Sequence, residues 1–331
     1  MMVKAVQTKD SVKASGSNKI IKFILRNGVY VLLILICLIL AIADSNFLTL
    51  DNLTNVFLQS SIMGVLALGM TFVICTGNID ISVGNMIGLC SACGIGLIQF
   101  YGVPWYISLV VMVGVGCLMG VLNGLCVAYI RIPSMLVTLA TQCIASGMVL
   151  VISKGKSWFD LPTQILAVSK NKFFGISCLL WVVLILYIFF HFVLGFTVFG
   201  RKVLAVGGNG EAAKASGIHT ERIILLTYII SGAVAGIAAI LQTARLGAFY
   251  ASMGSGMEMN VIAATVIGGT SMNGGRGSII GTLAGVLLLG IINNALNLLG
   301  VDANWQNVAR GIIILLAVII DAIRVRIDQA N

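Results

Sequence analysis

GRKVLAVGGNGEAAKASGIHTER, residues 200–222, is a polar segment in a chain that is otherwise rich in hydrophobic residues. The segments on its two sides, 174–197 and 223–243, contain no Lys, Arg, Asp or Glu. Each is long enough to cross a lipid bilayer as a helix, which takes about 20 predominantly apolar residues. We therefore expect the polar segment to lie in water beside a membrane, and the rest of the chain to be a helical assembly that moves with it.

A short helix is predicted inside the polar segment, at 209–217. Asn209 can accept a hydrogen bond at the helix start, Glu211 places a negative charge in the first turn, and Gly217 can end the helix in a left-handed conformation. Two to three turns are expected, held against the bilayer. Such a helix is suited to docking into a soluble partner, although an ordinary charged loop would show the same spacing.

The composition excludes an ordinary soluble protein. Of the 331 residues, 59% are hydrophobic and 9% are charged, against about 25% charged residues in soluble domains. The net charge of +9 comes from basic residues at the ends of apolar segments, not from a stripe with aromatic platforms, so nucleic acid is not an expected partner. The eight cysteines lie within apolar stretches, and neither a disulfide framework nor a metal site is predicted.

Hydropathy predicts a single membrane domain, 28–326, between a mobile basic cytoplasmic tail at 1–27 and a short C-terminal tail at 327–331. Most of the 20 Lys and Arg residues fall on one side when both termini are placed in the cytoplasm. About ten spans are predicted, one of them short or re-entrant: 28–43, 56–76, 84–101, 105–129, 134–153, 174–197, 223–243, 258–268, 277–299 and 305–323.

Glycines recur every four residues in three of these spans. In a membrane, small residues at this spacing let two helices approach closely, because lipid provides no hydrophobic force between them. The pattern predicts tight helix pairs at three sets of positions: Gly116, Gly120 and Gly124; Gly232 and Gly236; Gly281 and Gly285.

GNIDISVGN, residues 77–85, is the first of three polar stretches that are candidates for the functional site. It lies between two spans, and Asp80 is an ionisable group close to membrane depth, which favours a functional role. A helix beginning near Ser82 would instead make Asp80 a capping residue. Both interpretations stay open.

IPSMLVTLAT, residues 132–141, is the second candidate, and Asn123 precedes it. Pro133 is suited to starting a helix. Thr138 shares one side of that helix with Ser134, so their hydroxyl groups are available to a polar pathway. Hydrogen bonds back to their own helix are the alternative.

GGTSMNGGRGS, residues 268–278, is the densest glycine cluster. It superficially resembles a phosphate-binding loop, but Gly275 stands where such a loop requires Lys, so the chain has no recognisable ATP site. Ahead of it, Glu258 opens a short span, either as a helix-start charge or as a contact in a substrate pathway or with a partner. The glycines are expected to permit a sharp re-entrant turn: Gly268, Gly269, Gly274 and Gly275.

These stretches resemble, in the same order, motifs of the sugar-type ATP-binding cassette (ABC) permeases, the family that includes bacterial ribose and methyl-galactoside permeases. IDISVG is similar to their DLSVG motif, with Ile81 in place of Leu. The family also shows a Pro-x-x-x-x-Thr-Leu pattern, a GGTSLxGGxGS pattern and a cytoplasmic coupling stretch like 200–222. The resemblance covers roughly residues 30–325.

The resemblance implies a role for each group of residues. Coupling to an ATPase falls on Gly208, Asn209, Glu211, Ala212, Ala213, Ser216, Gly217 and Ile218. The resemblance implies that Asp80 has a role in the gate or translocation path. We assign the same expected role to the other candidates, Ser82, Asn123, Pro133, Thr138 and Glu258.

The resemblance also implies the assembly: an all-α bundle of the type II ABC importer kind, in the bacterial inner membrane, paired with a second permease subunit. Cytoplasmic ATPases would bind ATP and Mg²⁺, and an extracytoplasmic binding protein would deliver a monosaccharide. This chain itself is expected to be no enzyme and to bind no cofactor. A nucleoside or a furanone-type signalling molecule is an alternative cargo. An ion-coupled secondary transporter is the competing class, but it favours paired intramembrane acids, whereas Asp80 and Asp321 are isolated.

Overall fold

The computed structural model describes residues 29–42, 46–302 and the positions 304–309, 311, 312, 315 and 319. The predicted tails at 1–27 and 327–331 and much of the predicted last span, 305–323, lie outside these residues. The described part is almost entirely helical: Val29–Ile42, α2 Leu50–Cys75, α3 Val83–Tyr101, α4 Trp105–Ala128, α5 Ser134–Ser153, α6 Thr163–Lys170, α7 Cys178–Phe196, α8 Val198–Gly208, α9 Gly210–Ala215, α10 Thr220–Leu246, α11 Met257–Ile267 and α12 Ile279–Leu298, with a hairpin of β1 Lys172–Phe173 and β2 Ile176–Ser177.

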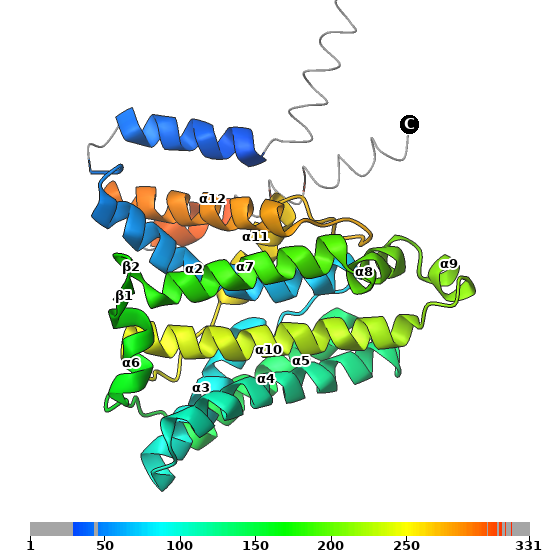
Figure 1. Ribbon diagram of the computed structural model, residues 1–331, viewed down its shortest axis with the longest axis horizontal. Helices are drawn as coiled ribbons and strands as arrows, with labels where there is room; N and C mark the ends of the chain where they lie inside the picture. Colours follow the sequence, from blue (N-terminus) through cyan, green and yellow to red (C-terminus); the bar gives the residue numbers. More distant parts are fainter. Residues whose placement is uncertain are drawn as a thin grey trace, which may run out of the picture.

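Seven of the described helices, α2–α5, α7, α10 and α12, are long and apolar enough to cross a membrane. Two shorter apolar helices, Val29–Ile42 and α11, correspond to the first span, predicted at 28–43, and to the short span, predicted at 258–268. A mostly helical membrane protein is therefore confirmed, and the count of about ten spans stays a prediction. The long helices lie side by side, with α8 and α9 at one end of the bundle and α6 with the hairpin at the other (Figure 1).

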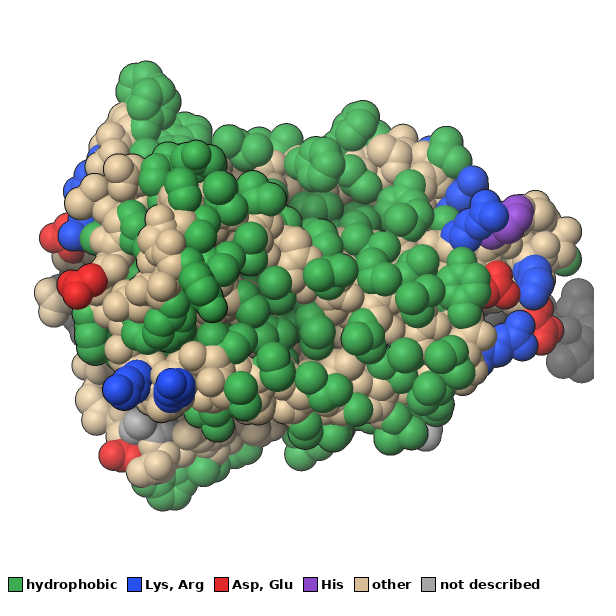
Figure 2. All heavy atoms as spheres, turned by 90° about the horizontal axis from the view of Figure 1, so that it is seen from below, with side chains coloured by type: hydrophobic (Ala, Val, Ile, Leu, Met, Phe, Trp, Pro, Cys, Tyr) green, Lys and Arg blue, Asp and Glu red, His purple; other side chains and the backbone are tan. Residues whose placement is uncertain are grey.

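The surface divides into three zones. Charged side chains gather at the two ends of the bundle, and the broad zone between them is covered mainly by hydrophobic side chains (Figure 2). Many large hydrophobic side chains in this zone are exposed, such as Val110 at 72% and Leu118 at 69%. An exposed apolar zone of this extent fits a lipid environment, because a soluble protein rarely exposes a large contiguous apolar patch.

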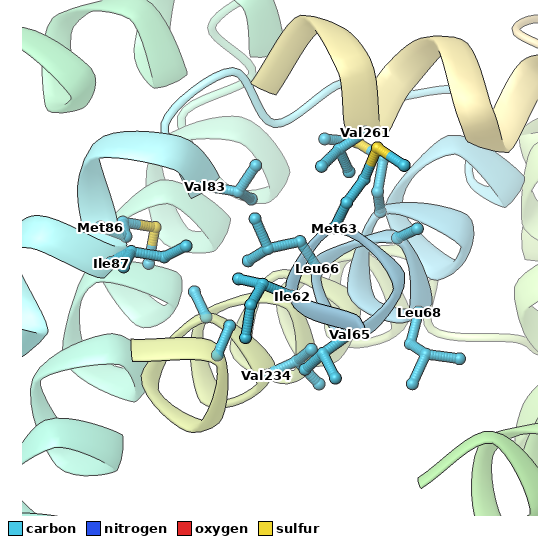
Figure 3. Close-up of a cluster of buried hydrophobic side chains, with 14 of the residues drawn as sticks. Ile62, Met63, Val65, Leu66, Leu68, Val83, Met86, Ile87, Val234 and Val261 are labelled. Carbon is cyan, nitrogen blue, oxygen red and sulfur yellow. The ribbon is translucent and has the colours of Figure 1, made fainter. Parts of the chain in front are cut away.

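Helix α2 forms the centre of the bundle. Its sequence is apolar on every side, and a helix of that kind is buried on every side; all residues from Ser60 to Cys75 are buried. Figure 3 shows Ile62 and Leu66 of α2 among Val83 and Ile87 of α3 and Val234 of α10. Helix α2 therefore packs against several helices, among them α7, α10, α11 and α12.

The predicted glycine faces are confirmed as helix contacts. A Cβ atom on Gly116 of α4 would overlap the carbonyl oxygen of Gly232 on α10, and one on Gly232 would overlap that of Gly116. Gly281 of α12 meets Gly268 in the same way, and Gly285 meets Ala264. Such close backbone approach is possible only without side chains, so these pairs fix the spacing of α4 with α10 and of α11 with α12.

Three local predictions need correction. The 200–222 segment contains two helices, because α8 continues through 198–208, where Val203 and Val206 are buried against the bundle. The second helix, α9, has six residues instead of two to three turns, since Ser216 and Gly217 end it early. The connection at 154–173 is not a plain loop: it contains α6, and the β1–β2 hairpin delays the start of α7 to Cys178.

Candidate functional site

The segment 76–82 between α2 and α3 is a break in the helical structure inside the bundle. Side chains from neighbouring helices satisfy its backbone. The hydroxyl groups of Tyr228 on α10 and Thr138 on α5 donate to the carbonyl oxygen of Ile79 at 3.1 and 3.5 Å. Ser134 Oγ accepts from the N–H of Ile79 at 3.2 Å. Broken backbone at membrane depth requires such internal partners, because lipid supplies none.

Asp80, at the middle of this segment, is completely buried. Its Oδ1 accepts hydrogen bonds from the backbone N–H and the hydroxyl of Ser82, and its Oδ2 accepts from Ser231 Oγ on α10 at 2.9 Å. Asn123 Nδ2 on α4 donates to Ser82 Oγ at 3.0 Å, while Asn123 Oδ1 has no hydrogen-bond partner among the residues that the structure describes. The carboxylate thus joins the start of α3 to the middle of α10.

Three residues that the sequence singled out separately, Asp80, Ser82 and Asn123, therefore form one cluster. Ser82 is the N-cap residue of α3, and its side chain makes no capping hydrogen bond. Asp80 contacts Ser82 itself and does not cap the helix. Sequence reasoning missed Ser231, a lone serine within an apolar span that carries no local signal.

Replacing Asp80 with Ala is expected to destabilise the bundle and to lower transport. The change leaves the buried Ser82 N–H and the Ser231 hydroxyl without their acceptor, and a buried polar group left without a partner costs about 1–3 kcal/mol. We expect a loss of roughly 2–3 kcal/mol, measured by thermal unfolding of the solubilised protein. Asp80→Asn, which keeps the shape and one carbonyl acceptor, should lose less. An unchanged unfolding temperature in Asp80→Ala would contradict this role.

Glu258 lies in the first turn of α11, as predicted, but it is buried, with 6% of its surface exposed. Its Oε1 accepts a hydrogen bond from Gln142 Nε2 on α5 at 3.0 Å, and its Oε2 has no hydrogen-bond partner. The side chain packs on Gly84, where a Cβ atom would overlap Oε2. Glu258 thus lies close to the start of α3, and Gln142 is a partner that the sequence did not indicate.

Pro133 precedes α5, as predicted, and is exposed. It therefore fixes where α5 begins, and the structure does not place it in the buried cluster with Asp80. Thr138 does reach the 76–82 segment through Ile79. Among the described residues, no group of three or more His, Cys, Asp and Glu side chains could hold a metal ion.

The predicted glycine turn, 268–278, meets two other segments at the α9 end of the bundle. The N–H of Gly275 donates to the carbonyl oxygen of Cys75, the last residue of α2, at 3.0 Å. A Cβ atom on Gly207 of α8 would overlap that same oxygen, and one on Gly274 would lie 2.7 Å from the N–H nitrogen of Gly77. We call this meeting of α2, α8 and the glycine turn the glycine junction.

The conformation of the turn depends on glycine at three of the four predicted positions. Gly269, Gly274 and Gly275 have φ values of +90°, +81° and +75°, a region that other residues rarely adopt. Gly268 instead permits the close contact of α11 with Gly281 of α12. The sequence indicated the turn but not its partners, and it missed Gly207, the residue of α8 with the closest backbone contact.

The short helix α9 projects at the end of the bundle (Figure 1). Asn209 Oδ1 caps it by accepting from the N–H of Ala212 at 2.9 Å, and Gly217, with φ +81°, ends it. Ala213 is buried, and Ile218 is half-buried behind it. The other coupling candidates are exposed: Gly208, Asn209, Glu211, Ala212, Ser216 and Gly217. Their exposure leaves this face of α9 accessible to another protein.

Comparison with known proteins finds that the chain is similar to membrane permeases. Residues 52–318 match the family described as "Branched-chain amino acid transport system / permease component". The chain is 37% identical over 296 residues to the ribose import permease protein RbsC of Bacillus subtilis, covering 89% of this chain and 92% of that one. It is 31% identical over 304 residues to RbsC of Haemophilus influenzae, covering 91% and 94%.

A relative with a different named cargo is similarly close. The autoinducer 2 import system permease protein LsrC of Yersinia enterocolitica is 35% identical over 298 residues, covering 89% of this chain and 82% of that one. No solved structure matches the chain. The family description names amino acids, whereas the relatives are named for ribose and autoinducer 2, so membership alone does not specify the cargo. The match over most of the chain, together with the bundle of apolar helices, shows that this protein belongs to that permease family and is an ABC transporter permease.

Proposed function

We propose that this chain is the membrane-spanning subunit of an ATP-driven, binding-protein-dependent importer of a monosaccharide such as ribose. The observation that carries the proposal is the glycine junction, because it connects an exposed docking helix to the core of the bundle through direct backbone contacts. The ATP and Mg²⁺ would be bound by a cytoplasmic ATPase that docks on α9. With α9 on the cytoplasmic side of the inner membrane, both termini lie in the cytoplasm.

The path of coupling begins at α9. A partner that moves α9 also moves α8, which precedes it directly at Asn209. Gly207 of α8 touches the last carbonyl of α2, so α8 cannot shift toward α2 without displacing it. The 76–82 segment follows α2 immediately, and through Asp80 it is bonded to Ser231 of α10. Movement of α9 is thereby passed to the segment where the helices are interrupted.

The opposite end of the bundle is suited to a delivery protein. Trp158 and Phe249 join the 154–173 connection to the end of α10 by two backbone hydrogen bonds of 3.0 and 2.8 Å, and their rings stack at 4.4 Å. Beside them, Phe159 and Tyr250 pack edge to face, and Phe159 is 64% exposed. A fixed platform with exposed aromatic side chains is typical of a protein contact surface.

A second permease subunit would complete the translocation path. Helix α5 carries Gln142, which is half-buried, and Ser146, which is exposed in the single chain, on one side. Pairing with an identical or related chain would enclose this partly polar surface away from lipid. The alternative cargoes, a nucleoside or a furanone-type signalling molecule, use the same architecture, and the similarity to LsrC favours the latter of the two.

Import by this chain is expected to depend on ATP. The gene would be deleted in its own organism and restored on a plasmid, and uptake of labelled D-ribose, D-galactose, D-allose and autoinducer 2 would be measured in both strains. In membrane vesicles from the restored strain, with binding protein added, ATP should drive uptake when a protonophore has removed the proton gradient. Uptake driven by a proton gradient alone, without ATP, would instead identify an ion-coupled secondary transporter.

A further inference from the structure

A cavity with a mixed polar and apolar lining opens between three segments of the bundle, and the coupling path described above does not use it. Its volume is about 280 Å³, close to the lower limit of the roughly 300–1,000 Å³ that small-molecule sites occupy. Helix α3, helix α5 and the connection between α10 and α11 supply its walls. The lining residues are Asn85, Ser146, Val149, Leu150, Ala251, Ser252, Met253 and Ser255.

The lining combines hydrogen-bonding groups with apolar ones and contains no charged side chain. Ser146, Ser252 and Ser255 are exposed, so their hydroxyl groups are accessible to a molecule in the cavity. The amide of Asn85 adds both a donor and an acceptor. Such a set suits neutral hydroxyl groups, each of which can donate and accept.

Glycine residues of α3 let the walls of the cavity approach one another closely. Gly88 of α3 lies between two of the walls, where a Cβ atom would be 3.0 Å from the carbonyl oxygen of Met253 and 3.3 Å from the side chain of Val149. Gly254 has φ +78° and packs on Gly84 of α3. The α10–α11 connection therefore has a fixed position against α3.

Polar groups continue from the cavity into the bundle. Asn85 Nδ2 donates to the carbonyl oxygen of Gln142 at 3.4 Å, and the side chain of Gln142 donates to Glu258 Oε1 at 3.0 Å. Within the described part of the chain, the buried Oε2 of Glu258 has no hydrogen-bond partner. Buried polar atoms in native proteins usually have partners, so the chain of polar groups that begins at Asn85 ends in an unused acceptor.

We propose that this cavity is a cargo-contact site, and that its cargo is a neutral small molecule with several hydroxyl groups. The inference rests on the import function proposed above. Asn85 and Ser146 contact the cargo, and Gln142 positions Asn85. Asp80, Ser82 and Asn123 are fully buried in this conformation, so they hold the interrupted segment while the cavity residues meet the cargo.

Uptake by two cavity variants tests the assignment. Ser146→Phe fills the cavity, and Asn85→Leu removes its amide. The matched control is Met148→Phe, which enlarges an exposed side chain two residues further along α5 and outside the lining. With labelled D-ribose as the probe, or whichever panel compound the unchanged chain imports, we expect uptake per amount of membrane protein to fall at least about tenfold in both variants. Met148→Phe should stay within about twofold of the unchanged chain, as surface changes usually do.

A specificity measurement separates cargo contact from damage to the bundle. If Asn85 binds a cargo hydroxyl, Asn85→Leu should reduce the preference for D-ribose over 2-deoxy-D-ribose in competition experiments by about tenfold. General loss of folding would lower both rates and leave the preference unchanged.

The outcomes distinguish the two proposals. If the unchanged chain imports no compound in the panel, the import function fails and this inference fails with it. If the unchanged chain imports and both cavity variants match it, the import function stands and the cavity is not a cargo site. If Met148→Phe loses as much uptake as Ser146→Phe, the exposed surface of α5 is what import requires, and the assignment to the cavity is wrong.

Discussion

Gly217→Pro is expected to abolish import while the chain still inserts into the membrane. Gly217 ends α9 with φ +81°, whereas proline is confined to φ near −65°. Its N–H also donates to the carbonyl oxygen of Lys214 at 3.0 Å, and proline has no N–H. Because α9 projects from the bundle, the change should misdirect this helix and leave the membrane-spanning helices in place.

The matched variant is Gly217→Asn, since asparagine adopts the left-handed region more readily than other non-glycine residues. No atom lies within 4 Å of the position of a Cβ atom on Gly217, so the asparagine side chain meets no obstacle. We expect uptake by Gly217→Pro to fall below about one hundredth of that of the unchanged chain, because proline in an incompatible backbone position costs about 3 kcal/mol or more. Gly217→Asn should keep at least about half of the uptake of the unchanged chain. Normal import by Gly217→Pro, at equal abundance in the membrane, would count heavily against α9 as the coupling helix.

Gly207→Ala is expected to disconnect α8 from the core, whereas Gly208→Ala should be tolerated. The two residues are adjacent in the same helix and carry the same change. At Gly207 the added methyl group would overlap the carbonyl oxygen of Cys75, but at Gly208 the nearest atom is 3.9 Å away. Backbone atoms cannot give way as a flexible side chain does, so α8 must move away from α2.

Overpacking of this kind costs about 1–3 kcal/mol and occasionally more, and we expect Gly207→Ala to lower uptake at least about 20-fold, which corresponds to the middle of that range. Gly208→Ala should stay within about twofold. Uptake and ATP hydrolysis should be measured together: hydrolysis that continues without uptake would show that α8 has lost its connection to α2. Equal uptake by the two variants would show that the glycine junction does not transmit movement.

Local sequence patterns predicted the membrane helices and the faces along which some of them pack. The four-residue glycine spacing correctly indicated contact faces on α4, α10 and α12, because a helix repeats its surface at that interval. It did not indicate which helix each face meets. The same reasoning missed α8. Gly200, Gly207 and Gly208 weaken the intrinsic preference for a helix there, and the helix forms because Val203 and Val206 pack into the core.

The candidate site could be predicted only in part. Asp80, Ser82 and Asn123 were conspicuous as polar residues near membrane depth, but nothing in the chain indicated that they share one network. Ser231 lies 151 residues from Asp80, and Gln142 lies 116 residues from Glu258. The residues around a serine or a glutamine in an apolar span do not indicate its hydrogen-bond partner, because that partner lies on another helix.

Hydropathy is summed over about 20 consecutive residues and needs no knowledge of distant segments, so the sequence by itself determined the membrane-spanning helices, the exposed polar segment at 200–222 and the need for a sharp glycine turn. Only the tertiary structure decided that the turn meets Cys75 and Gly207, and that Asp80 is bonded to α10 and enclosed. Those contacts join residues that are far apart in the chain. The glycine junction requires that Gly207 lack a side chain where it meets the carbonyl oxygen of Cys75, and the bond between Asp80 and Ser231 requires that the 76–82 segment and α10 lie side by side. Both contacts therefore depend on how the helices are packed.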